Sequence, residues 1–300
     1  MELNLISWNV NFIHDNWSNR LININNKLEK EIEKSDIICL QEATLPFSDI
    51  FTNIYKFLKG TDVKYFPSQE LFAEKEYFYK TLQEYFPKYK EFIVYVFEKL
   101  MDKALYIIGK FYSYFGEDIK KIYFEHPFIM IILVLMCPLL FCGQWAFFGM
   151  LTLVNKKIKT NVKCKYIGRT IQYMDFVYNN KNITLVNIHL SPGSSLAQQK
   201  KRYEQILKIL DFVKNKKNVI LCGDFNAIYK SKEIQLLKKH KFVNCGKKIH
   251  KKNLKTFPSD KPRKCIDYFF VKGNIKPKNY ELFGTYKETD HKGIKCTVII

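Results

Sequence analysis

"VILCGDFN", residues Val219–Asn226, is a short apolar run that ends in polar side chains. Its apolar residues predict a buried strand over Asn218–Phe225. Asp224 and Asn226 lie two positions apart, so in an extended chain both side chains project from the same side. One interpretation is ordinary turn chemistry, because Asp, Asn and Gly end strands in many proteins. The other is a functional site at the end of this strand.

The same pattern recurs along the chain, where polar residues lie at the ends of other strand-like runs. These residues are Asn9, Glu42, His189, Asp267, Asp290 and His291. Each alone would fit a turn. Together with the end of the Asp224 strand they make six such places in one chain, and this number favours a common site.

Short apolar runs alternate with helical patterns. The predicted strands are Leu3–Val10, Asp36–Ala43, Gly149–Asn155, Thr170–Tyr178, Asn182–Leu190, Asn218–Phe225, Lys264–Val271 and Gly293–Ile300. Apolar residues at helical spacing predict helices around Leu21–Ile32, Ser194–Asn215 and Lys232–His240. On the second helix, the residues expected on the buried side include Leu196, Tyr203 and Leu207. Hairpin-linked and helix-separated strands both occur, which indicates an α/β protein with mixed sheets and helices outside.

Three of the polar residues, Asn9, Glu42 and Asp290, carry hard oxygen ligands. Such ligands suit Mg²⁺, which keeps several waters and takes only one or two carboxylates from a protein. Mn²⁺ is expected to substitute for Mg²⁺, and no other cofactor is predicted.

The remaining polar residues suit chemistry at a phosphorus centre. Asp224 could orient or deprotonate a water molecule, and His291 and His189 could stabilise or protonate a phosphoryl oxygen. Asp267 could fix one of the two imidazoles. With a metal ion, the set predicts attack of water on a phosphoester. The chain has no Cys or Ser nucleophile motif and no P-loop.

Six motifs, taken in order, resemble the endonuclease/exonuclease/phosphatase superfamily. They are SWNV, DIICLQE, VNIHL, VILCGDFN, TFPSDKPRKCIDYFFV and TDH. The superfamily includes deoxyribonuclease I, apurinic-site endonucleases, inositol phosphatases and neutral sphingomyelinases. The resemblance covers Met1 to about Phe66 and Gln144 to Ile300. It implies a single domain over residues 1–300 with an α/β fold, a four-layer α/β/β/α sandwich of two mixed sheets. Residues of about 67–145 are then a helical, hydrophobic insertion.

The resemblance also implies a metal site. Asn9, Glu42 and Asp290 are expected around Mg²⁺. Some of the nucleases carry an acidic residue two positions after the first-strand Asn, where this chain has Asn11. This departure argues against a second metal ligand at that position, and it leaves the rest of the site unchanged.

The same resemblance implies roles around the phosphate. Asp224 with Asn226 is expected on the attacking water. His291, paired with Asp267, is expected to contact the phosphate, and His189 is expected near the side of the leaving group.

The chain has a formal net charge of +20 and a pI near 9.4. A field this positive attracts phosphate-rich partners such as nucleic acid or an anionic membrane surface. Compositional drift toward Lys is an equally good explanation. The segment Lys238–Lys264, with Asp260 as its only acid, is expected either to rim the active site or to form a solvated loop.

The cysteines and the first residues indicate the cellular compartment of the protein. None of the eight cysteines forms a C-x-x-C pair, so a zinc or redox motif is not expected. Several lie in apolar runs, where Cys acts as a small hydrophobe. We expect reduced thiols in a cytosol-facing compartment. The opening MELNLISWNV does not resemble a signal peptide.

The segment Pro127–Val154 has no charged side chain and is long enough to cross a bilayer. Asn9 and Glu42 precede it, whereas Asp224 and Asp290 follow it. If these residues share one metal ion, both flanks must lie on the same side of any membrane, so a single crossing is excluded.

We expect instead a monotopic insertion. An amphipathic helix near Phe92–Ile108 would lie in the membrane plane, and the apolar tip would enter and return. An anionic membrane surface would then be bound through about residues 90–145. The alternatives are a hairpin with the preceding helix, burial on the protein, and a contact between subunits.

Together these features predict a Mg²⁺-dependent phosphoesterase associated with a membrane surface. The membrane segment favours a phospholipid or sphingolipid headgroup as the substrate. The first alternative is a DNA or RNA endonuclease or exonuclease, because the positive charge would follow a phosphate backbone. The second alternative is a non-catalytic membrane adaptor. The oligomeric state is left open.

Overall fold

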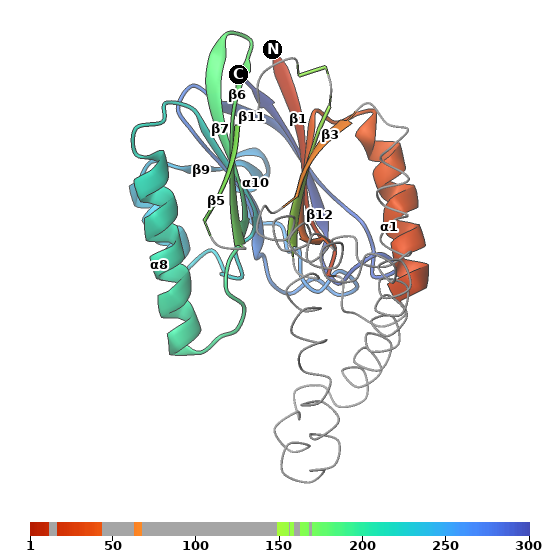
Figure 1. The fold of residues 1–300 in the computed structure, drawn as a ribbon. Coiled ribbons are helices and arrows are strands. Elements are labelled where there is room, and N and C mark those ends of the chain that lie inside the picture. The colour runs from red at the N-terminus through yellow and green to blue at the C-terminus, as the bar shows by residue number, and fades with distance from the viewer. Residues whose placement is uncertain (12–16, 44–62, 68–148, 156, 159–162, 168–169) are drawn as a thin grey trace, which may run out of the picture.

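The computed structural model describes residues 1–11, 17–43, 63–67, 149–155, 157–158, 163–167 and 170–300. Its helices and strands are β1 Glu2–Asn9, α1 Trp17–Ile32, β2 Ile37–Ala43, β3 Val63–Pro67, β4 Gly149–Asn155, β5 Lys163–Ile167, β6 Ile171–Tyr178, β7 Lys181–His189, α8 Leu196–Val213, β8 Val219–Asp224, α9 Lys232–Lys239, β9 Val243–Asn244, α10 Cys245–His250, β10 Asp267–Lys272, β11 Lys276–Phe283 and β12 Gly293–Ile299. Two six-stranded sheets face each other, with α1 outside one sheet and α8 outside the other (Figure 1). The expected α/β/β/α sandwich is confirmed.

Each sheet is mixed and has one parallel pair at its centre. The first sheet has the order β11-β12-β1-β2-β4-β3, and β1 and β2 are its parallel pair. The second has the order β5-β6-β7-β8-β10-β9, and β7 and β8 are its parallel pair. A parallel pair needs a crossover connection. α1 lies in the connection between β1 and β2, and α8 lies in the connection between β7 and β8.

Apolar side chains fill the spaces between the layers. Leu5 and Leu185 belong to the cluster between the two sheets. Leu28 of α1 packs on the outer face of the first sheet, and Ile206 and Ile209 of α8 pack on the outer face of the second. The central strands are therefore covered on both faces, which explains why they are nearly continuous apolar runs in the sequence.

The predicted buried side of α8 is partly wrong. Leu196, Tyr203 and Leu207 have exposed fractions of 82 %, 36 % and 45 %. Arg202 and Ile209 lie on the buried side instead. Arg202 can be buried because its guanidinium pairs with a buried carboxylate of α9 at 3.0 Å. A buried helix face predicted from apolar residues alone does not include an arginine whose side chain is buried.

The predicted insertion at about 67–145, with its amphipathic helix near Phe92–Ile108, lies outside the described residues. The last residues of the uncharged segment form β4, as expected. Among the residues that the structure describes, no helix is long and apolar enough to span a bilayer.

The two ends of the chain lie side by side. β1 and β12 are antiparallel neighbours, and the backbone N–H of Ile300 donates to the carbonyl of Met1 at 3.0 Å. Both ends lie at the same end of the sandwich, and β1 runs from there toward Asn9 (Figure 1). The carboxyl end of β1 is therefore far from the two termini along the sandwich axis.

Gly223 of β8 allows close contact with β7. Its φ is +134°, and a Cβ there would lie 1.9 Å from the carbonyl oxygen of Ile188. Gly223→Ala is therefore expected to destabilise the fold by more than about 3 kcal/mol, measured by thermal unfolding. Gly193→Ala is the control, because its φ is +97° but a Cβ would meet only the Gln198 side chain, at 3.2 Å. Equal losses of Tm would show that the positive φ, and not the contact with β7, determines the cost.

Candidate active site

The carboxyl ends of the two central parallel pairs meet at one end of the sandwich. β1 ends at Asn9, and Glu42 is the residue before the last in β2. His189 and Asp224 end β7 and β8, where they are paired across the two strands. Asn9 Nδ2 donates to Asp224 Oδ2 at 3.1 Å, which joins the first sheet to the second. These four predicted site residues are thus brought together from both sheets.

Asn9 bridges two carboxylates. Its Nδ2 donates to Glu42 Oε1 at 3.0 Å and to Asp224 Oδ2 at 3.1 Å. Its Oδ1 accepts the backbone N–H of Asn11 at 2.9 Å. Two carboxylate acceptors require the amine side of the amide, so the orientation of Asn9 is determined. The oxygen that would serve as a metal ligand already accepts one hydrogen bond.

Glu42 lies at an irregularity in the pairing of β2 with β4. Its φ is +49°, in the left-handed region that non-glycine residues rarely adopt. Strain of this kind is found mainly where a side chain must be directed to a particular place. Here the irregularity directs the carboxylate toward Asn9 and His189.

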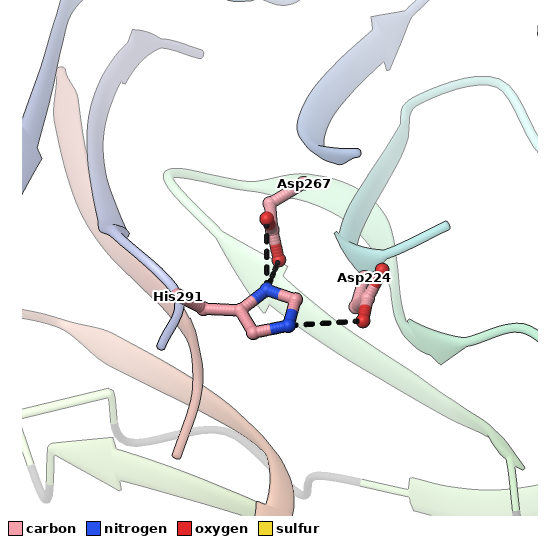
Figure 2. A group of neighbouring side chains, drawn as sticks. All are labelled: Asp224, Asp267 and His291. Carbon is pink, nitrogen blue, oxygen red and sulfur yellow. Dashed lines mark hydrogen bonds and ion pairs between the residues drawn. The ribbon is translucent and has the colours of Figure 1, made fainter. Parts of the chain in front are cut away.

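Carboxylates lie beside both ring nitrogens of His291 (Figure 2). Nδ1 lies 3.1 Å from each carboxylate oxygen of Asp267, and Nε2 lies 3.8 Å from Asp224 Oδ2. The backbone carbonyl of His291 accepts the indole N–H of Trp8 at 3.2 Å, and its ring lies 4.9 Å from that of Phe257. The imidazole therefore has one orientation, with Nε2 toward Asp224.

Neighbouring carboxylates determine the charge of this imidazole. Burial opposes the charged form of His291, but Asp267, Asp224 and Asp290 outweigh burial and raise its pKa to about 10. Burial and the charge of Asp267 raise the pKa of Asp224 to about 6, against the opposing effect of His291 and His189. In the metal-free protein at neutral pH, an imidazolium therefore faces an ionised Asp224.

Asn226 and His189 complete the surroundings of Asp224. The backbone N–H of Asn226 donates to Asp224 Oδ1 at 2.7 Å, and its Nδ2 donates to Asp224 Oδ2 at 3.2 Å. His189 Nε2 lies 3.4 Å from Glu42 Oε1 and 4.0 Å from Asp224 Oδ2. Asn226 thus holds the Asp224 carboxylate directly, and His189 lies between two carboxylates.

Asn11 contacts Asp290, and Arg20 holds the loop that carries it; neither was predicted as a site residue. Asn11, noted only as a departure from a family pattern, donates from Nδ2 to Asp290 Oδ1 at 2.8 Å. Arg20 of α1 donates to the carbonyls of Asn11 and Glu288, each at 2.8 Å, and so connects the two loops that carry the site. No sequence pattern singles out Arg20, because a charged residue in an amphipathic helix is normally on its solvent face.

The sequence of this chain matches a known protein family. A family model described as the Endonuclease/Exonuclease/phosphatase family matches residues 6–291. The chain belongs to this family. Its members are metal-dependent phosphoesterases and nucleases, so this protein is a hydrolase that acts on phosphoester bonds.

Solved structures share its fold at low sequence identity. A humanized TDP2 of D. rerio carrying 14 mutations is 15 % identical with a TM-score of 0.60, and the match covers 100 % of this chain and 99 % of that one. D. rerio TDP2 complexed with a single strand DNA product is 15 % identical with a TM-score of 0.57, at the same coverage. The endonuclease/exonuclease/phosphatase from Bacteroides vulgatus is 12 % identical with a TM-score of 0.58, covering 100 % and 99 %. No curated protein matches the chain.

Enzymes of this family use divalent metal ions, and the carboxylates of the site fit such an ion. Glu42 and Asp290 each have one carboxylate oxygen that accepts no hydrogen bond from any described residue. Hard, free carboxylate oxygens suit Mg²⁺ or Mn²⁺. Asp224, Asp267 and His291 also have ligand atoms within 4.8 Å of one another, but Nδ1 of His291 is already engaged by Asp267. The free oxygens of Glu42 and Asp290 are thus the more accessible donors.

The raised pKa of His291 predicts how the stability of the metal-free endonuclease/exonuclease/phosphatase protein varies with pH. A His whose pKa rises from 6.5 to about 10 on folding contributes its full stabilisation below about pH 6.5 and loses it as the pH rises through about 10. Urea unfolding in EDTA should therefore show the free energy of unfolding falling from about pH 7 to about pH 8. Above this range the buried thiols of Cys222, Cys245 and Cys265, whose pKa values burial also raises, add to the fall. His291→Gln should remove most of the fall from about pH 7 to about pH 8, and His240→Gln, at an exposed position, should retain it. The same slope in both variants would contradict the assignment.

Proposed function

We propose that this enzyme hydrolyses phosphodiester bonds of nucleic acid, with Mg²⁺ or Mn²⁺ as its metal ion. The observation that carries the proposal is the position of His291 between Asp267 and Asp224 (Figure 2). The distance of 3.8 Å between Nε2 and Asp224 Oδ2 is too long for a hydrogen bond. The Nε2–H of the imidazolium is therefore available to a phosphate oxygen, beside a carboxylate that can serve a water molecule.

Each of the five predicted catalytic side chains has a task in this proposal. Asp224, held by Asn226, orients the attacking water and accepts its proton. His291, fixed by Asp267, donates from Nε2 to a non-bridging oxygen and stabilises the negative charge that grows on it. His189 lies near the leaving oxygen and supplies a proton to it.

The metal ion is placed at Glu42 and Asp290 in this proposal. Asn9 positions both the metal ligand Glu42 and the base Asp224, because its amide donates to both carboxylates. When bound, the ion polarises the phosphoryl group and neutralises part of its charge.

Nucleic acid is favoured as the substrate by the charge of the surface next to the site. The segment Asn226–Lys264 leaves the site after β8, forms α9 and α10, and returns to the start of β10. It contains thirteen Lys or Arg residues and two acidic ones. A positive surface of this kind follows a phosphate backbone. D. rerio TDP2, which shares the fold, has been crystallised with a single strand DNA product.

A lipid headgroup is the second candidate substrate, favoured by the uncharged segment Pro127–Val154. In this case the enzyme would be membrane-associated, bind an anionic surface through about residues 90–145, and keep its site in a reducing, cytosol-facing compartment. Free cysteine thiols are typical of such a compartment. Among the residues that the structure describes, the free cysteines are Cys39, Cys222, Cys245, Cys265 and Cys296.

Cell fractionation after deletion of Glu117–Gly143 tests the membrane proposal. Loss of the protein from the membrane fraction would support it, and a variant that still pellets with membranes would rule out this anchor. A non-catalytic adaptor is not proposed, because the family consists of hydrolases.

One assay compares the two substrate classes. The protein is incubated with Mg²⁺ or Mn²⁺ and with single-stranded oligonucleotide, plasmid DNA, abasic oligonucleotide, sphingomyelin vesicles or phosphoinositide vesicles. Cleavage of a nucleic acid at the highest kcat/KM is the expected result. Turnover of a lipid alone would reject nucleic acid in favour of the second candidate.

A further inference from the structure

A tyrosine outside the catalytic group lies on the loop between β8 and α9. Tyr229 follows Asn226 by three residues, and three residues of extended chain span at most about 11 Å. Its carbonyl accepts a hydrogen bond from Gln235 of α9, and the carbonyl of Ala227 accepts one from Tyr268 of β10. The loop is therefore fixed at the same end of the molecule as Asp224.

Two ammonium groups converge on this tyrosine from different helices. Lys238 Nζ of α9 lies 5.1 Å from the ring centroid, and Lys247 Nζ of α10 lies 4.5 Å from it. Lys247 Nζ also donates to the Tyr229 hydroxyl at 3.2 Å, and Lys238 Nζ donates to Gln235 Oε1 at 2.9 Å. Cation–π attraction and these hydrogen bonds hold two long side chains in one place.

The positive charge of this cluster is not balanced. Neither Lys238 nor Lys247 pairs with a carboxylate in the part of the chain that the structure describes. Burial would raise the pKa of Tyr229, but the hydrogen bonds and charges of the two lysines outweigh burial and lower it. The Tyr229 hydroxyl accepts from Lys247, so its own O–H can donate outward. Three donors and no negative charge are what a phosphate group requires.

A basic groove adjoins the cluster. Lys200, Lys230, Lys232 and Tyr203 line a cavity of about 630 Å³ between α8 and α9. Gln235, which contacts both Tyr229 and Lys238, also lines it. The carboxylate in its lining is neutralised by a buried arginine of α8. The cluster and the groove therefore offer positive charge next to one another.

We propose that Tyr229, Lys238 and Lys247 form a phosphate subsite that binds the backbone of a single-stranded nucleic acid, a few nucleotides from the bond that is cut. This proposal rests on the proposed function. A ligand that reaches the subsite, the groove and the catalytic group must carry several phosphates in series, which a lipid headgroup does not. Asp224 and His291 are only 1 % and 5 % exposed, so the strand must bend to reach them. A single strand bends more easily than a duplex, whose persistence length is about 150 base pairs.

Oligonucleotide binding without turnover tests the subsite. Fluorescence anisotropy of a labelled oligo-dT in EDTA is measured over a series of KCl concentrations. Lys238→Gln/Lys247→Gln should bind about tenfold more weakly than wild type at low salt. Its slope of log K against log salt should be smaller in magnitude by about 0.7 to about 1.4, as expected for one or two lost phosphate contacts. Lys217→Gln/Lys276→Gln removes two exposed charges at the end that carries the termini, and it should match wild type within about twofold.

A third variant and a hydrolysis assay complete the test. Tyr229→Phe keeps the ring and removes the hydroxyl, so it should lose affinity without unfolding. Wild-type affinity in both subsite variants, or equal losses in the two double variants, would overturn the subsite. The subsite would also be overturned if the variants bound phosphatidylserine vesicles more weakly than wild type but bound oligo-dT as well as wild type. Hydrolysis of bis(p-nitrophenyl) phosphate by the wild type reports on the proposed function separately, and its absence together with a selective loss of oligonucleotide binding would reject the function and keep the subsite.

Discussion

His291→Gln is expected to lower kcat for a phosphodiester at least about 10³-fold, because it removes the charged donor that faces the phosphate. The prediction follows from the fixed ring, whose Nδ1 lies 3.1 Å from Asp267 and whose Nε2 is directed toward Asp224. Steady-state hydrolysis of bis(p-nitrophenyl) phosphate with Mg²⁺ or Mn²⁺ measures the effect. His240→Gln makes the same chemical change at an exposed position and should leave kcat unchanged.

Substitution of Asp267 tests whether this carboxylate acts through His291. Asp267 acts through His291, so Asp267→Asn should lower kcat less than His291→Gln does, and adding it to His291→Gln should cause little further loss. Stability should behave differently. His291→Gln leaves a buried carboxylate without its partner, at a cost of about 3–5 kcal/mol, and the double variant should recover part of that cost. Losses of kcat that multiply in the double variant would show that the two residues act independently.

Glu42→Gln is expected to weaken the response of the enzyme to its metal ion and to lower its activity. The variant keeps the size of the side chain and an oxygen that can accept from Asn9, so the fold should be retained. It removes the carboxylate charge that a divalent ion requires. We expect kcat to fall about 10³-fold and the Mg²⁺ concentration for half-maximal activity to rise at least about tenfold, measured by titration of activity against Mg²⁺.

Glu29→Gln is the matched control for this change, since Glu29 lies exposed on α1. It should have the wild-type metal response and the wild-type Tm. Normal turnover of the Glu42→Gln variant at wild-type Mg²⁺ concentrations would place the metal elsewhere. Normal turnover in both Glu42→Gln and His291→Gln would reject the proposed site as a whole.

The central strands could be predicted from the sequence because burial on both faces makes them apolar throughout. β1, β2, β7 and β8 end within one or two residues of the expected positions. The edge strands gave no such signal. In β11, Tyr280 is buried, while Lys276 is exposed, so no apolar run marks this strand. β9 has only two residues, which is too short for any periodicity to be seen.

The site was predictable in its residue types but not in its contacts. Asn9 and Asp224 are 215 positions apart, and their hydrogen bond exists because two sheets pack face to face. The sequence suggested that Asn9 is a metal ligand, and the structure adds that its amide links Glu42 to Asp224. The cluster at Tyr229 was not foreseen either, because it depends on how α9 and α10 are placed beside one loop.

The hydrogen bond between Ile300 and Met1 has a practical consequence for protein engineering. A short glycine-rich peptide could join the two ends, and the polypeptide could be reopened at the hairpin turn Asn179–Asn180, which connects β6 to β7. Such a circular permutant would have every strand in its original place with a new order of synthesis. It would also free both ends for fluorophores or fusion partners without bringing them near the catalytic group.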